Sequence, residues 1–282
     1  MFTRMNNNRR QIAMVIGSGS VKCAASIGMW KVFQQENIDI SMSVGCSGGS
    51  IYAAIFALGF SEQLAEEETK NLWTSELFGG YAANLRSVMS GETRFTEKSG
   101  LIDAEPIYER LKVVLGDKTF SDTHIPLYII ATDLYTGESV TITEGSILDA
   151  VRASIAIPMV FPAWEVNGQL LVDGAVSNPI PVDVAIKEGG EIIAAMGFEL
   201  PTRPRLRSYT AFTNHFNSIY MNNILRSSFA FHNVVHHSEI IPILPQFDRK
   251  IGSFDVQHIP YIIEQGAQTT NDQIPYIKRL IR

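Results

Sequence analysis

The chain has 282 residues, 45% of them hydrophobic and 18% charged, a composition that excludes a disordered protein. Its 23 lysines and arginines against 29 aspartates and glutamates give a net charge of −6, which argues against the basic surface that non-specific nucleic-acid binding needs. With only two cysteines, Cys23 and Cys46, a disulfide framework is excluded and a cysteine-based zinc site is disfavoured.

The sequence shows neither a secretory signal nor a membrane span. The apolar run after the N-terminal arginines covers residues 12–16, shorter than the roughly 7–15 residues of a signal-peptide core. The most apolar segment, residues 51–58, is far below the roughly 20 residues of a spanning helix. We therefore expect a cytoplasmic protein, with peripheral contact at the inner membrane surface as an open alternative.

Short apolar runs alternate with amphipathic segments along the chain. They predict a strand at 12–16, a turn at 17–20, a helix at 24–35, a strand at 40–44, a turn at 45–49 and a helix at 50–58. Further helices are predicted at 107–115, 148–154 and 181–187, and further strands at 127–131, 139–142, 170–172 and 191–196.

This alternation predicts an α/β fold, a three-layer sandwich with a mainly parallel central sheet flanked by helices. Such sheets bind ligands at the carboxyl ends of their strands, where the two glycine-rich turns fall. We expect a single domain over residues 1–282, with a core at about 12–200 and a C-terminal helical and sheet extension at 201–282 that packs on it.

The sequence Gly45-Cys46-Ser47-Gly48-Gly49 stands between a predicted strand and a predicted helix. Gly-x-Ser-x-Gly in this setting is typical of a nucleophile elbow, in which the serine lies on a strained turn between small residues. The helix that follows directs its N-terminal amides toward the serine. The alternative interpretation is an ordinary strand-to-helix turn with a capping serine.

Residues 17–22, Gly-Ser-Gly-Ser-Val-Lys, form the other glycine-rich turn, whose amides are suited to hold a phosphate or an oxyanion. A dinucleotide fingerprint fits poorly, because Lys22 takes the place of the third glycine, although Asp39 lies at a suitable distance. A third signal, Asp173-Gly174-Ala175 after a predicted strand, indicates by itself only a turn.

Together and in this order, the three motifs resemble the patatin-like phospholipase family, in particular its compact bacterial members. The family pattern is a glycine-rich oxyanion loop with a basic residue, then Gly-x-Ser-x-Gly, then Asp-Gly-Ala/Gly. Segments similar to the family also lie at 22–28, 131–134, 151–162 and 178–183. The resemblance is clear from about residue 12 to 198 and is traceable to the end of the chain.

The resemblance implies a serine lipid acyl hydrolase of the phospholipase A, lysophospholipase or carboxylesterase type. It makes Ser47 the nucleophile and Asp173 the general base of a dyad, with an acyl-enzyme intermediate and a lipid or ester substrate, and with no metal or cofactor. A carboxylate is a weak base unless burial raises its pKa. The backbone around Ser18, Gly19 and Ser20 is implied to form the oxyanion hole, supported by Gly17, Lys22, Gly45, Gly48, Gly49 and Gly174.

One position departs from the family pattern, because Cys23 stands where a glycine usually follows the basic residue. Cysteine lacks the conformational freedom of glycine, so we expect a changed loop shape rather than a lost site. We expect Lys22 to order the loop or to add positive potential, without a role in proton transfer.

The histidine cluster has two interpretations. His232 and His236 lie one helical turn apart, a spacing that can bind a metal, with His237 next to them. Glu239 is a poor third ligand, so packing or surface roles are favoured. We expect Asp133 to serve a turn and Asp183 to begin or stabilise a helix.

Two segments fit the α/β alternation less well. Residues 201–237 begin with Arg203, Arg205 and Arg207 and continue with Phe212, Phe216, Ile219, Tyr220 and Ile224 at helical spacing. They are interpreted either as a core-facing helix packing on the sheet, or as a lid or membrane-contacting surface with arginines near anionic head groups. Residues 71–98 are a candidate mobile cap over the acyl site.

Two other functions compete with the acyl hydrolase. One is a Ser-His-Asp α/β-hydrolase that uses His258, although Ser47 lies early in the chain for that fold. The other is a non-catalytic lipid-binding or regulatory protein that has kept the fold, which the presence of both Ser47 and Asp173 disfavours. No oligomeric state is predicted.

Overall fold

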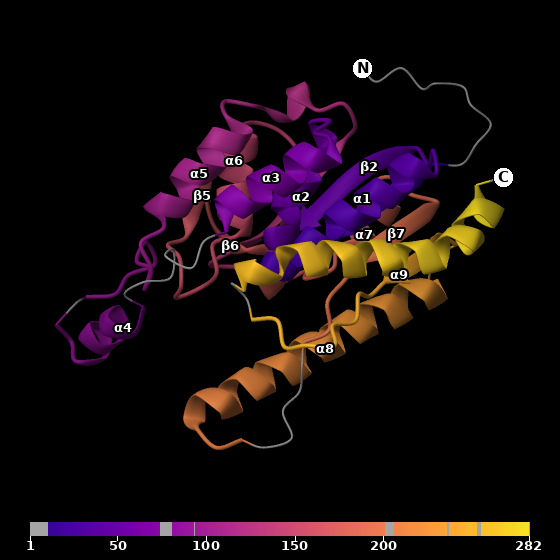
Figure 1. The fold of residues 1–282 in the computed structure, drawn as a ribbon. Helices are drawn as coiled ribbons and strands as arrows, with labels where there is room; N and C mark the ends of the chain where they lie inside the picture. Colours follow the sequence, from indigo (N-terminus) through magenta and orange to yellow (C-terminus); the bar gives the residue numbers. More distant parts are fainter. Residues whose placement is uncertain are drawn as a thin grey trace.

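The computed structural model describes residues 11–73, 81–92, 94–200, 206–235, 237–252 and 255–281. These residues form a central eight-stranded sheet with helices on both faces, so the predicted α/β sandwich is confirmed (Figure 1). The strands are β1 (Ile12–Ile16), β2 (Ile40–Cys46), β3 (Leu127–Asp133), β4 (Ser139–Ile142), β5 (Trp164–Val166), β6 (Gln169–Asp173), β7 (Ile192–Met196) and β8 (Glu239–Ile243).

The strand order is β5-β6-β3-β2-β1-β7-β8, with β4 paired to β3 outside this path. The five strands β3, β2, β1, β7 and β8, neighbours in this order, run parallel to one another. Strands β4 and β6 run antiparallel to β3, and β5 runs antiparallel to β6. The sheet is therefore mainly parallel, and the carboxyl ends of β1 and β2 meet at one edge.

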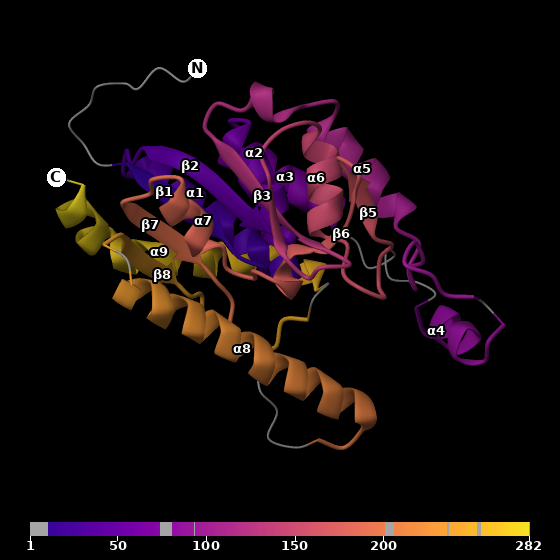
Figure 2. The same cartoon turned by 180° about the vertical axis from the view of Figure 1, so that it is seen from behind.

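The helices are α1 (Ala25–Gln35), α2 (Gly48–Ala57), α3 (Glu62–Leu72), α4 (Tyr81–Met89), α5 (Glu105–Leu115), α6 (Ile147–Ser154), α7 (Val182–Lys187), α8 (Tyr209–Val235) and α9 (Ile259–Leu280). Figure 2 shows α7 and α8 on one face of the sheet, opposite the larger group that contains α1, α2 and α9. Strand β1 serves both cores, since Ile12, Met14 and Ile16 pack under the larger group and Ala13 and Val15 under the smaller one.

The helices α1 and α9 lie against each other along their length. Two glycines allow this close packing, because a Cβ atom at Gly28 would meet the backbone of Ile263 and Ala267, and one at Gly266 the backbone of Ala25. This contact holds α9 against α1, the helix that follows the first glycine-rich turn. The sequence did not predict α3, β5, β8 or α9 as individual elements.

The helix α8 buries a different side from the one its aromatic spacing suggested. Leu225 and Phe229 pack into the smaller core, whereas Phe212 and Phe216 are 50% and 62% exposed and Tyr220 is 65% exposed. The helix therefore packs on the core as the first interpretation expected, but the aromatic stripe is not the side that it buries. Arg203 and Arg205 lie outside the described residues.

The other unusual segment, residues 71–98, contains the end of α3 and all of α4. Helix α4 stands apart from the sheet in both views (Figures 1 and 2). Residues 74–80 and 93 lie outside the described part of the chain. Among the described residues, no helix is long and apolar enough to cross a membrane.

Candidate active site

Ser47 lies in the tight turn between β2 and α2, at the carboxyl edge of the sheet. Its backbone has φ 55° and ψ −132°, a strained conformation for a residue with a side chain. Gly45 permits the turn, because a Cβ atom there would lie 2.6 Å from the Cβ of Ala53. The geometry is that of a nucleophile elbow.

Hydrogen bonds from a distant segment hold the elbow in place. The Ser47 N–H donates to Ser154 Oγ at 2.9 Å, and the Ser154 hydroxyl donates in turn to the carbonyl of Ile130 at 2.6 Å. From the other side, the Ser50 hydroxyl donates to the Ser47 carbonyl at 2.6 Å. Ser154 is a positioning residue that the sequence reasoning missed.

Asp173 ends β6 and faces Ser47 directly. The Ser47 hydroxyl donates to Asp173 Oδ2 at 2.7 Å, and the Ala175 N–H donates to Oδ1 at 2.8 Å. The Thr132 hydroxyl donates to the Asp173 carbonyl at 2.9 Å, so the main chain is fixed as well. The two residues, 126 positions apart in sequence, are thus joined by a single hydrogen bond.

Burial controls the charge of Asp173, which is 3% exposed. Loss of water around the carboxylate raises its pKa to about 6, against the opposing effect of the hydrogen bonds from Ala175 and Ser47. A carboxylate with this pKa is a stronger base than an ordinary aspartate and is still ionised near neutral pH.

The first glycine-rich turn approaches Ser47 from β1. Its start is fixed by the sheet, because the Gly17 N–H donates to the Met196 carbonyl at 2.9 Å and the Ser18 N–H to the Pro179 carbonyl at 2.8 Å. The Ser18 amide is therefore already engaged, in contrast to its expected role in an oxyanion hole. Gly19 and Ser20 follow, and all three residues line the same cavity as Ser47.

Cys23 is accommodated without strain, although a glycine was expected there. Its φ is negative, unlike that of Ser20 and Ser47, so this position does not need glycine's freedom. Its buried thiol donates to the Gly17 carbonyl at 3.4 Å. Burial raises the pKa of both the Cys23 and the Cys46 thiol.

A cavity of about 460 Å³, here called the serine cavity, contains Ser47 and Asp173 in its wall. Its remaining wall is largely apolar and includes side chains of the segment after β7 and of α8: Phe198, Leu200, Tyr220, Met221 and Leu225. None of the described residues of 71–98 lines this cavity, so the described part of that segment does not cap it. Helix α8 does form part of its wall.

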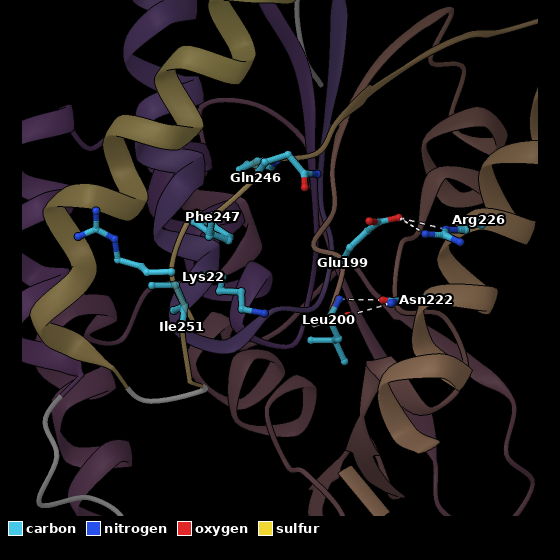
Figure 3. Close-up of a pocket in the computed structure, with 10 residues that line it drawn as sticks. Lys22, Glu199, Leu200, Asn222, Arg226, Gln246, Phe247 and Ile251 are labelled. Carbon is cyan, nitrogen blue, oxygen red and sulfur yellow. Dashed lines mark hydrogen bonds and ion pairs between the residues drawn. The ribbon is translucent and has the colours of Figure 1, made fainter. Parts of the chain in front are cut away.

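Lys22 separates the serine cavity from a second one of about 270 Å³ (Figure 3). It is only 4% exposed, and burial lowers the pKa of its ammonium group. Across the second cavity, Arg226 pairs with Glu199 at 2.8 Å, and Asn222 makes two hydrogen bonds with the backbone of Leu200. Lys22 therefore lies beside the first glycine-rich turn and lines both cavities.

The other candidate residues lie outside the serine cavity. None of the described residues that line it is a histidine, and His258 stands before the start of α9. The part of the chain described by the structure contains no cluster of three metal-ligating side chains, and His236 is outside that part. Asp133 accepts two turn amides, from Tyr135 and Thr136 at 2.9 Å, as expected.

The family model for patatin-like phospholipase matches residues 14–186, well over half of the chain. The chain belongs to the patatin-like phospholipase family. An uncharacterised NTE family protein of Mycobacterium tuberculosis is 30% identical over 172 residues, covering 61% of this chain and 44% of the relative. Mouse patatin-like phospholipase domain-containing protein 6 is 24% identical over 188 residues, covering 66% of this chain and 13% of the relative.

These matches span less than half the length of either patatin-like relative. Among solved structures, VipD from Legionella pneumophila is similar with a TM-score of 0.49 and 12% identity, covering 96% of this chain and 67% of that chain. The type III effector ExoU gives a TM-score of 0.43 at 13% identity, with 94% of this chain and 53% of that chain covered.

Proposed function

We propose that the chain is a serine lipid acyl hydrolase with Ser47 as nucleophile and Asp173 as general base. The observation that supports this best is the 2.7 Å hydrogen bond between Ser47 Oγ and Asp173 Oδ2 in the wall of a largely apolar cavity. Membership of the patatin-like phospholipase family favours an acyl ester of a lipid as the substrate.

The proposed reaction proceeds through an acyl-enzyme. Asp173 takes the proton of the Ser47 hydroxyl as Oγ attacks the ester carbonyl, and the amides of Gly19 and Ser20 stabilise the oxyanion. Collapse of the tetrahedral intermediate expels the alcohol, which receives the proton from Asp173. A water molecule then gives its proton to Asp173 and attacks the acyl group, which releases the acid and returns the proton to Ser47.

The test uses the wild-type protein with p-nitrophenyl butyrate and a fluorogenic phospholipid, together with a fluorophosphonate that labels activated serines. We expect hydrolysis of both esters and a label that mass spectrometry locates on Ser47. Ser139→Ala, an exposed serine on β4, is the matched control and keeps the label. Absence of hydrolysis and of labelling in the folded protein would contradict the proposal and favour a binding role.

The pH dependence follows from the pKa of about 6 for Asp173. Because the ionised carboxylate is the base, kcat/KM for the butyrate ester should rise about tenfold per pH unit below 6 and level off above it. The pKa of Asp173 in the folded protein also lies above its value in the unfolded chain. The stability that Asp173 contributes is therefore complete below about pH 4 and is lost as the pH rises to about 6. A rate profile that is flat between pH 4.5 and 7 would contradict this assignment.

A Ser-His-Asp triad is the competing mechanism, and it requires a histidine next to Asp173. The described lining of the serine cavity offers none. Replacement of His258 by alanine should therefore leave ester hydrolysis unchanged, with folding checked by circular dichroism. Loss of activity in the folded variant would favour the triad.

A further inference from the structure

The first half of α8 carries a row of exposed apolar side chains, here called the α8 ridge: Phe212, Phe216, Ile219 and Tyr220. Their spacing of three or four residues places them on one side of the helix. The rings of Phe212 and Phe216 are in contact, with centroids 5.6 Å apart. Phe212, Phe216 and Tyr220 expose half or more of their surface, an unfavourable arrangement unless something covers them.

The same helical segment is poor in residues that carry a permanent charge. From residue 209 to residue 225 the sequence has neither an acidic residue nor a lysine or arginine, in a chain with 18% charged residues. Exposed helix faces in water normally carry charges, whereas a helix that lies in a lipid interface presents an apolar face. Arg207, just before α8, is exposed as well.

The ridge is continuous with the mouth of the serine cavity. Tyr220 belongs to both, since it is 65% exposed and also lines the cavity. The lining also includes Val176, which is 55% exposed, and Pro158. Met159, the residue after Pro158, is 68% exposed. Three separate segments thus contribute apolar side chains to the wall of one cavity.

The shape of the molecule leaves the ridge accessible to an extended surface. In both views the residue-209 end of α8 reaches past the sheet and past α9 (Figures 1 and 2). The exposed side chains of the ridge therefore belong to the projecting half of α8. A second copy seated on the ridge would block entry to the cavity, whereas a lipid surface at the same place would supply the acyl chain, so a lipid surface is the better match.

We propose that the α8 ridge and the apolar rim of the serine cavity seat this protein on a phospholipid bilayer, with the cavity mouth facing the lipid. An acyl chain then passes from the bilayer into the cavity along apolar side chains, without crossing water. This inference rests on the proposed acyl hydrolase function, because that function is what identifies a lipid as the partner of the ridge. Because the ridge itself is uncharged, insertion should depend only weakly on salt.

The test measures co-sedimentation with vesicles of dioleoylphosphatidylcholine, in a Ser47→Ala background so that no lipid is hydrolysed. The double substitution Phe212→Ser and Phe216→Ser, at two positions that do not line the serine cavity, should weaken binding about tenfold or more. Val234→Ser is the matched control, since Val234 is 85% exposed near the other end of α8 and should bind like the parent. Hydrolysis of soluble p-nitrophenyl butyrate by the double variant carrying Ser47 should stay at the wild-type rate.

The outcomes separate the two proposals. Vesicle binding without ester hydrolysis would retain the docking surface and reject the acyl hydrolase. Equal binding by the double variant and its parent, or no binding by either, would overturn the docking surface. So would a wild-type dimer in solution that the double substitution dissociates, because the ridge would then be an interface between copies.

A second measurement guards against a double variant that fails to fold. Phe216→Trp keeps an aromatic side chain, and its added fluorescence should shift to the blue on vesicles and be quenched by brominated lipid. If the emission of the introduced tryptophan is the same with and without vesicles, insertion of position 216 is contradicted.

Discussion

Replacing Asp173 with asparagine is expected to lower kcat for a soluble ester by at least about 10³-fold in a protein that stays folded. Asparagine keeps the shape of the side chain and can still accept the hydrogen bond from the Ala175 N–H. The amide cannot take up the proton of Ser47, and an amide nitrogen facing Oγ would donate a hydrogen bond instead of accepting one. The loss should therefore fall on the chemical step, with little change in KM.

The stability of Asp173→Asn distinguishes lost chemistry from lost structure. A buried carboxylate is costly to ionise, so the neutral variant should unfold at an equal or higher temperature than the wild type at pH 7. Ser47→Ala should show a comparable loss of kcat. Asp133→Asn, at a half-buried position at the end of β3 that does not line the serine cavity, should keep full activity. Activity that survives in folded Asp173→Asn would mean that another group is the base.

Replacing Gly266 with alanine is expected to destabilise the protein by about 2 kcal/mol or more. In most helices a glycine-to-alanine change gains about 0.5–1 kcal/mol, because alanine restricts the unfolded chain. Here the added Cβ atom would meet the backbone of Ala25, which cannot rotate away as a side chain could. The helices α1 and α9 would have to separate, which would weaken the largest helix–helix contact of the fold.

Urea unfolding at a fixed pH measures this change in the free energy of unfolding. The control is Gln268→Ala, an exposed position on the same helix that should alter stability by less than about 0.5 kcal/mol. A Gly266→Ala variant as stable as the wild type would show that α9 shifts along α1 without cost.

The sequence predicted most of the sheet, because a buried parallel strand followed by a small-residue turn is a local pattern. The pair Ser47–Asp173 was implied by the resemblance of three ordered motifs to a known family, since Asp173-Gly174-Ala175 by itself indicates only a turn. The hydrogen bond of Ser154 to the Ser47 N–H joins residues 107 positions apart, and nothing in either segment encodes it. The engagement of the Ser18 amide by Pro179 is equally non-local.

Helix α8 shows a different limit of sequence reasoning. Apolar spacing predicts that a helix has an apolar side, but two such sides exist here. Leu225 and Phe229 are spaced by one turn and are buried, whereas Phe212 and Phe216 have the same spacing and are exposed. Which side is covered depends on how far the helix extends past the sheet, a property of the tertiary structure.

The burial of both cysteines has a consequence for where the chain can work. Oxidation requires an accessible thiolate, and burial at Cys23 and Cys46 removes solvent access and raises the pKa of each thiol. Cys46, which directly precedes Ser47, is thereby protected from oxidants as long as the fold is intact. Free cysteines therefore do not restrict this protein to a reducing environment.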